Sequence, residues 1–306
     1  TGIEHGTITA IIDSYKYEIT SLRKDVATDG RHANVEFSLD WKEDAARRDF
    51  SINSIYSNKE GNLFDPYDGK KDLESGTINF IGDAEERIKE DYLRILRYIR
   101  FFLNYSSQSH NPEVIKIIKR NIKGVSNLSS ERLIDELQKL TKSNNFIKIF
   151  KDKISLELLE IIFPQLKNLQ NLKKLNSYGV KNLSKIDFIF LISLLIVDGT
   201  DNVDYFIYKF NISKKDQKRL KVIDSFYKEN VSIKNFTEKK LEFDKFESII
   251  DKSESDITFY IQLVNENDLI YPSSSIKVFQ GIPFFARKGA ELYTRHTRET
   301  VCPLPF

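Results

Sequence analysis

The pattern that decides the fold is Lys89-Glu-Asp-Tyr-Leu-Arg-Ile-Leu-Arg-Tyr-Ile-Arg-Phe-Phe102. Charged residues recur at every third position, so on a helix they form one polar stripe that drifts slowly around the axis. The members of this stripe are Asp91, Arg94, Arg97 and Arg100. Apolar residues are expected to cover the opposite, buried face, namely Tyr92, Ile95, Leu96, Ile99 and Phe102. The segment therefore predicts one helix with a buried face and a charged face.

The charges of the stripe match the hydrogen-bonding pattern of two nucleotide bases. Arginine offers only donors and a carboxylate only acceptors. Cytosine and adenine both present an amino group beside a ring nitrogen, so Asp91 can accept from the first and Arg94 can donate to the second. Guanine and uracil mismatch both contacts, at roughly 1–3 kcal/mol each. Arg97 and Arg100 suit phosphate contacts. A solvated helix face with ion pairs remains the alternative interpretation.

Strand-like sequence precedes this segment. Residues 7–12 and 15–22 predict a hairpin, and residues 34–38 a further short strand. The polar stretch 23–31 ends in Thr-Asp-Gly and predicts a loop. A helix is expected to begin at Asp40, with Glu43 completing a capping box.

Turn residues between 61 and 75 predict a connector, and the pattern is helical from Asp83 onward. The main helices are expected at 85–103, 112–122, 129–140, 145–151, 156–162, 185–197 and 214–229. We therefore predict an α+β fold, in which a mixed α/β unit is followed by an all-α part.

Composition narrows the class of protein. The 306 residues are 40% hydrophobic and 12% aromatic, which indicates a globular chain with room for two or three domains. A net charge of +2 neither demands nor excludes nucleic acid. No apolar run approaches the roughly 18 residues of a membrane helix, so no membrane partner is expected. The lone Cys302 fits a reducing compartment, and we expect a cytoplasmic protein. The histidines show no zinc spacing.

Seven ordered blocks within residues 1–140 resemble bacterial class II tRNA nucleotidyltransferases (CCA-adding enzymes) and their poly(A) polymerase relatives. The blocks are Gly2-Ile-Glu-His-Gly-Thr7, Tyr17-Glu-Ile-Thr20 with Leu22-Arg23, Thr28-Asp-Gly-Arg-His-Ala33, Arg47-Arg-Asp-Phe-Ser-Ile-Asn53, Asp65-Pro66…Gly69…Asp72-Leu73, Glu90-Asp91…Arg94…Arg97…Arg100-Phe101 and Ser130-Glu-Arg-Leu133…Glu136-Leu137. The resemblance fades through residues 141–270 and is absent from the last 30.

The resemblance implies two-metal transfer with Mg²⁺, using CTP and ATP to add C, C and A to the 3′ end of tRNA. It assigns base reading to Asp91 and Arg94. It makes Arg48 a triphosphate or ribose contact with Asp49 beside it, and Arg97 and Arg100 further nucleotide contacts. Glu18 matches the third acidic position near the metals.

The resemblance also implies a domain order. Residues 1–60 would be the C-terminal part of a nucleotidyltransferase head, 61–82 a connector, and 83–145 a helical neck with the nucleotide-recognition helix. Residues 146–273 would form a helical body for RNA binding. Residues 274–306 differ in composition, being poor in lysine and richer in Gly, Pro, Arg and aromatics, and fit either a native irregular tail or foreign sequence.

One departure from the family pattern concerns the metal ligands. The family carries an Asp-x-Asp pair after a glycine-rich loop, and this sequence contains neither that pair nor any methionine, even at position 1. We therefore expect the first strands and the metal-binding aspartates to be missing, leaving no metal ligand to name and a chain that is inactive alone. A poly(A) polymerase, an enzyme adding only CC or only A, and a non-catalytic helical RNA-binding protein are the alternatives. The oligomeric state is left open.

Overall fold

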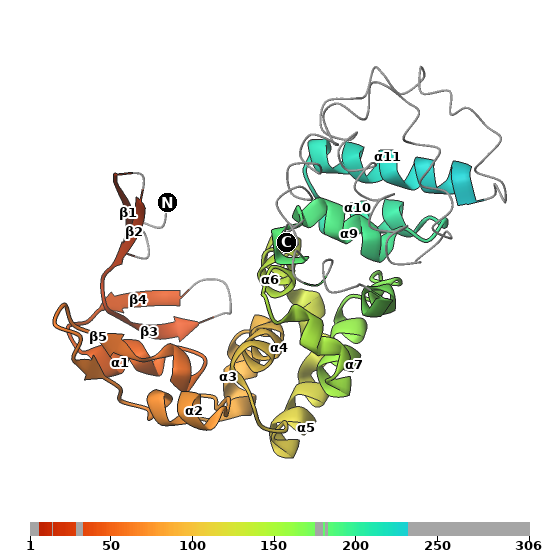
Figure 1. Cartoon of the computed structure of the whole chain (residues 1–306). Coiled ribbons are helices and arrows are strands. Elements are labelled where there is room, and N and C mark those ends of the chain that lie inside the picture. Colours follow the sequence, from red (N-terminus) through yellow and green to blue (C-terminus); the bar gives the residue numbers. More distant parts are fainter. Residues whose placement is uncertain (1–5, 14, 29–32, 175–179, 181–182, 232–306) are drawn as a thin grey trace, which may run out of the picture. The chain divides into compact units, whose positions relative to one another are not determined.

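A computed structural model of the chain describes residues 6–13, 15–28, 33–174, 180 and 183–231 (Figure 1). The chain divides into two compact units, Thr1–Ile162 and Phe163–Phe306. The predicted tail 274–306 and Cys302 lie outside the described residues.

The first unit begins with paired strands. β1 (Thr7–Ile12) and β2 (Tyr15–Thr20) form an antiparallel hairpin, with Thr7 opposite Thr20, which confirms the predicted hairpin. β3 (Arg23–Thr28) pairs with β4 (Ala33–Phe37). The predicted strand at 34–38 is therefore confirmed, but the loop predicted for residues 23–31 is wrong over 23–28. Pairing with β4 satisfies the backbone of this polar segment, and that partner is not visible in its local composition.

Short elements follow the strands. α1 (Trp41–Ala46) is capped as predicted, because Asp40 accepts from the Lys42 amide at 2.7 Å. The capping box is not formed, since Glu43 instead accepts from Ser38 Oγ at 2.5 Å. Beyond them lie η2 (Ser51–Asn53), β5 (Tyr56–Ser57) and β6 (Leu63–Phe64).

The predicted connector contains a helix, α2 (Gly69–Ser75). Asp65 explains its start, because the carboxylate accepts from the amides of Gly69 and Lys70, both at 2.8 Å. Some of the Asp and Gly residues that predicted turns at 61–75 therefore lie at the N-terminus of a helix, with Asp65 before it and Gly69 as its first residue.

The helix predicted at 85–103 is interrupted. α3 (Ala84–Glu90) ends at Asp91, whose φ of −153° and ψ of 103° are extended, and α4 (Leu93–Tyr105) then begins. Asp91 accepts from the amide of Leu93, the first residue of α4, at 3.1 Å, and Tyr92 is the N-cap of that helix. Asp91 therefore lies in the turn and not on the helical stripe, which consists of Arg94, Arg97 and Arg100 only.

The core of this unit forms around α4. Ile95, Leu96 and Ile99 are fully buried as predicted, whereas Tyr92 and Phe102 are half-buried. The helices α5 (Pro112–Asn121), α6 (Ser130–Thr141) and α7 (Lys153–Ile162) complete the unit, with η3 (Ile122–Asn127) and η4 (Phe146–Phe150) between them. Phe50 packs on Phe101 with ring centroids 5.1 Å apart, which joins the segment after α1 to α4.

The second unit is helical throughout its described part. It comprises η5 (Leu169–Lys174), η6 (Leu183–Lys185), α9 (Phe188–Ile196), α10 (Asn202–Phe210) and α11 (Lys214–Val231). α9 is buried on nearly all sides and is capped by Asp187. In the described part of the chain, no helix has both the length and the apolar character needed to cross a bilayer.

Gly124 of η3 lies close against the ring of Tyr92, the residue after Asp91. A Cβ on Gly124 would lie 2.2 Å from Cε1 of Tyr92, the residue that follows Asp91. We expect Gly124→Ala to lower the free energy of unfolding by about 1–3 kcal/mol because the Tyr92 ring must move. Urea denaturation measures this change.

The control for this prediction is Ser126→Ala, an exposed change in the same η3, expected within about 0.5 kcal/mol of wild type. Adding Tyr92→Ala to Gly124→Ala should remove most of the penalty of the glycine change. Strictly additive effects would contradict the contact.

Candidate nucleotide-recognition site

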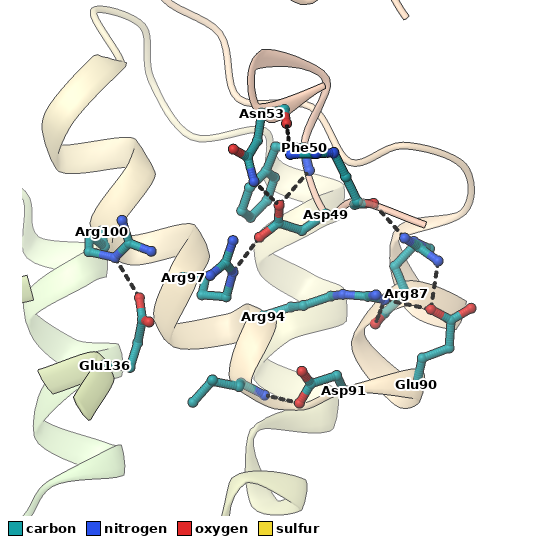
Figure 2. Close-up of polar contacts among 12 residues, drawn as sticks. Asp49, Phe50, Asn53, Arg87, Glu90, Asp91, Arg94, Arg97, Arg100 and Glu136 are labelled. Atoms are coloured by element: carbon teal, nitrogen blue, oxygen red, sulfur yellow. Dashed lines mark hydrogen bonds and ion pairs between the residues drawn. The ribbon is translucent and has the colours of Figure 1, made fainter. Parts of the chain in front are cut away.

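The candidate site is assembled from three parts of the first unit (Figure 2). The segment after α1 supplies Arg48 and Asp49, the α3–α4 turn and α4 supply Asp91 and the three arginines, and α6 supplies partners for them. The arginines of α4 point to different partners, although they share one stripe on the helix.

Asp49 and Arg97 form a buried ion pair. Asp49 is 4% exposed, and its carboxylate accepts from Arg97 Nε and from Asn53 Nδ2, the latter at 3.0 Å. Burial alone would raise the pKa of Asp49, but the hydrogen bond and charge of Arg97 outweigh it and hold that pKa below its usual range. The same pairing raises the pKa of Arg97 against the opposing effect of burial. Both groups are therefore charged at neutral pH.

Arg100 turns toward α6. Its Nε donates to Glu136 Oε1 at 2.5 Å, and Glu136 is only 1% exposed. The other oxygen of Glu136 is buried and has no hydrogen-bond partner among the described residues. Arg97 and Glu136 also attract each other electrostatically, so the ion pairs of Arg97 and Arg100 are coupled through Glu136.

Asp91 and Arg94 lie close in sequence but bind different partners. Arg94 Nη1 donates to Glu90 Oε2 and to the Arg87 carbonyl, both at 2.6 Å. Asp91 accepts from Arg132 of α6 at 2.6 Å, in addition to the Leu93 amide. No hydrogen bond joins the two side chains among the described residues.

Arg48 belongs to a separate polar cluster with α1 and β5. Its guanidinium donates to Asp44 at 3.2 Å, to Tyr56 Oη at 3.1 Å and to the Asn53 carbonyl at 3.1 Å. Burial raises the pKa of Tyr56 to about 12, together with its hydrogen bond to Asp44. Burial also raises the pKa of Asp44, but Tyr56 and Arg47 outweigh this effect and lower it overall.

Glu18 lies apart from these residues. It is an exposed residue of β2, opposite Thr9 of β1, and no hydrogen bond or ion pair of the described residues connects it to the arginines. No three His, Cys, Asp or Glu side chains in the described part of the chain are grouped so that they could hold a metal ion. Glu18 and the charged residues of the candidate site therefore do not fit a magnesium site.

Sequence reasoning did not name the partners that orient the site. Glu136 and Arg132 could have been found, because both stand in the block Ser130–Leu137 and their i,i+4 spacing places them on one face of a helix. Asp44 and Tyr56 carried none beyond their residue types, since their roles depend on contacts made at a distance along the chain.

Comparison with known families identifies the chain. Residues 1–79 match the poly A polymerase head domain. Residues 111–170 match the probable RNA and SrmB-binding site of polymerase A. The chain belongs to the class II CCA-adding enzyme and poly(A) polymerase family. As a member of this family it has both the head and the RNA-binding domain.

Individual relatives agree with this family. The mitochondrial CCA tRNA nucleotidyltransferase 1 of Homo sapiens is 48% identical over 146 residues, which is 47% of this chain and 34% of the relative. The Mus musculus enzyme of that name is 39% identical over 219 residues, 71% of this chain and 50% of the relative. The chain thus spans between a third and a half of these relatives.

A solved structure supports the fold. The Bacillus stearothermophilus CCA-adding enzyme in complex with CTP matches with a TM-score of 0.53 at 22% identity, over 74% of this chain and 55% of that one. The α+β fold class expected from the sequence is thereby confirmed.

Removing either member of the Asp49–Arg97 pair should have unequal effects. Arg97→Met leaves a buried carboxylate without compensation and should lower the free energy of unfolding by about 3–5 kcal/mol. Asp49→Asn keeps an acceptor for Arg97 and should cost about 1.5–3 kcal/mol. Urea denaturation at neutral pH measures both.

Arg120→Met is the matched control, because its ion pair with Glu85 at 3.0 Å is exposed and should contribute no more than about 1 kcal/mol. The loss of unfolding free energy caused by Arg97→Met should become smaller as the pH falls below 3.8, the ordinary pKa of an aspartate. The lowered folded-state pKa of Asp49 means that its stabilisation is present above that value and lost on protonation. Equal penalties for Arg97→Met and Arg120→Met would refute the pairing.

Proposed function

We propose that this chain is the base-selecting and RNA-holding part of a tRNA nucleotidyltransferase that adds C and A to tRNA 3′ ends. Its substrates are tRNA, CTP and ATP, and Mg²⁺ serves the complete reaction. Residues 1–60 act as part of the head, 61–82 as connector, 83–145 as neck and 146–273 as RNA-binding body. The observation that carries this proposal is the unused hydrogen-bonding capacity of Asp91 and Arg94.

Asp91 is held in place without being saturated. Each of its two oxygens accepts one hydrogen bond, from Leu93 and from Arg132, and a carboxylate oxygen can accept two. One acceptor position per oxygen is therefore available to the amino group of cytosine or adenine.

Arg94 is held in the same way. Its Nη1 makes both of its contacts, and Nε and Nη2 have no partner among the described residues. These donors suit the ring nitrogen beside the amino group. Guanine and uracil present a ring N–H and a carbonyl at those places, which mismatch both contacts.

The remaining residues surround this pair. Arg48, with 34% of its side chain exposed, is the contact for triphosphate or ribose, and Asp49 orients the site through Arg97. Arg97 and Arg100 supply further positive charge toward the nucleotide. Glu18 stays assigned to the acidic position near the metals, on the resemblance alone.

Addition of CCA is favoured over poly(A) synthesis because the human and mouse relatives are CCA tRNA nucleotidyltransferases by name. The lone cysteine favours a reducing compartment, and the cytoplasm is the proposed location, although those two relatives are mitochondrial by name.

Titration of the chain with each of the four nucleoside triphosphates tests the base-reading pair. CTP and ATP should bind more tightly than GTP and UTP, by roughly 5- to 150-fold for each mismatched contact of about 1–3 kcal/mol. Asp91→Asn should narrow this preference, because an amide can donate as well as accept. Isothermal titration calorimetry gives the four affinities.

Glu113→Gln provides the control, since this carboxylate is exposed and its nearest cation, Lys116, is 3.9 Å away. It should leave all four affinities unchanged. GTP binding as tightly as CTP to the wild-type chain would remove the basis for assigning Asp91 and Arg94.

We further propose that these 306 residues do not transfer nucleotides by themselves, because the sequence holds no Asp-x-Asp pair. Incubation with tRNA lacking its CCA end, radiolabelled CTP or ATP, and Mg²⁺ should give no incorporation. A CCA-adding enzyme that contains the pair serves as the positive control. Magnesium-dependent incorporation by this chain would overturn the proposal.

A further inference from the structure

We propose that a pocket between the C-terminal ends of α4 and α6 binds one nucleotide of a single RNA strand, on the premise of the RNA-holding role proposed above. The pocket has a volume of about 740 Å³ and continues into the loop 142–145 that follows α6. It lies entirely within the first unit. Asp91 and Arg94 do not line it, and Arg100 is the one residue of the proposed nucleotide site that does.

The pocket presents amide groups, which can read the edge of a base. Asn104, Gln138, Asn144 and Asn145 all line it. Asn104 Oδ1 accepts from Ser143 Oγ, and Asn145 Nδ2 donates to the Asn104 carbonyl at 3.4 Å, so these two are fixed in place. The side chains of Gln138 and Asn144 have no hydrogen-bond partner among the described residues. Each therefore offers donors and an acceptor to a ligand.

An aromatic ring stands at the edge of the pocket. Tyr105, the last residue of α4, is 49% exposed and leans against Phe101, with ring centroids 5.7 Å apart. An exposed ring supported from behind is a platform on which a base of any type can stack. The pocket thus combines stacking with hydrogen bonding.

The pocket also carries positive charge suited to a phosphate. Arg100 is held at Nε by Glu136 and its guanidinium carbon lies 4.8 Å from the Phe101 ring centroid, while its Nη groups have no hydrogen-bond partner among the described residues. Lys142 is exposed and lines the pocket, and no ion pair of the described residues engages it. Lys139 is paired with Asp135 at 2.6 Å, where both side chains are largely exposed. Such a pair contributes little and can be exchanged for a phosphate.

A strand of RNA fits this arrangement better than a free nucleotide. The lining is polar, so a single base gains little from apolar burial, and the lysines at the rim can contact the neighbouring phosphates that only a polymer provides. The loop and the end of α6 also lie inside residues 111–170, which match an RNA-binding family model.

Binding of an unmodified tRNA transcript that ends before CCA tests the pocket. In fluorescence anisotropy, Tyr105→Ala should weaken binding at least about fivefold, whereas Tyr105→Phe should bind like wild type because it keeps the stacking ring. Tyr17→Ala, which removes a tyrosine of 50% exposure on β2, should leave the affinity unchanged. Circular dichroism and thermal melts confirm that each variant is folded.

Salt dependence separates the two kinds of contact. A plot of log affinity against log salt concentration has a negative slope. Lys142→Ala should make this slope shallower by about 0.7–0.9, as expected for the loss of one phosphate contact, while Tyr105→Ala should leave it unchanged. Both residues are exposed, so neither substitution is expected to disturb folding.

The outcomes are distinct. Unchanged affinity in both Tyr105→Ala and Lys142→Ala overturns the pocket but leaves the tRNA partner standing. No binding of tRNA to the wild-type chain overturns the tRNA partner and the pocket together. CMP and AMP are tested as competitors of the transcript. If either one displaces the transcript at the concentration at which the free mononucleotide binds, and Tyr105→Ala abolishes this displacement, the pocket is a mononucleotide site and the strand proposal is overturned.

Discussion

The arrangement of the site depends on the buried ion pair between Asp49 and Arg97. A carboxylate that is 4% exposed must be compensated, and the compensating guanidinium comes from a residue 48 positions later in the chain. The contact is directional, so it sets the rotation of α4 about its axis. The Phe50–Phe101 contact beside it adds apolar packing at the same junction. Together they fix the segment after α1 against the helix.

The rotation of α4 determines where its other charges point. With Arg97 directed at Asp49, Arg100 meets Glu136 of α6, and Arg94 lies over the end of α3 against Glu90 (Figure 2). A second contact joins α6 to this region, because Arg132 of α6 donates to Asp91 in the turn between α3 and α4. Four acidic residues and four arginines thus order three segments that are distant in sequence.

The sequence predicted those features that have local causes. The β1–β2 hairpin, the cap at Asp40 and the buried Ile95, Leu96 and Ile99 each follow from spacing or from neighbouring residue types. The strand β3 and the break at Asp91 were not predicted, because β3 depends on its pairing with β4 and the break involves the Asp91 carboxylate, which accepts from the first amide of α4. For the site, the charged residues of α4 and Arg48 were found, but their partners, Glu136 for Arg100 and Asp44 for Arg48, depend on tertiary contacts. The spacing of three residues from Asp91 to Arg100 also predicted one continuous helical stripe, whereas the chain turns at Asp91.

Burial divides the charges into two classes with different consequences for ligand binding. Asp49 and Glu136 have side chains that are 3% and 1% exposed, so separating them from their arginines would leave an uncompensated charge in the interior. The carboxylates that bind Arg94 and Arg132 are more open, with 36% exposure for Glu90 and 22% for Asp91, although the Arg94 side chain itself is 13% exposed. Contacts of that kind exchange readily with solvent or with a ligand. In the proposed function, a nucleotide base would therefore compete for Asp91 and Arg94 and not for the buried Asp49–Arg97 pair. The buried pairs keep Asp91 and Arg94 in one orientation, and the proposed selection of a base by protein groups requires such a fixed orientation.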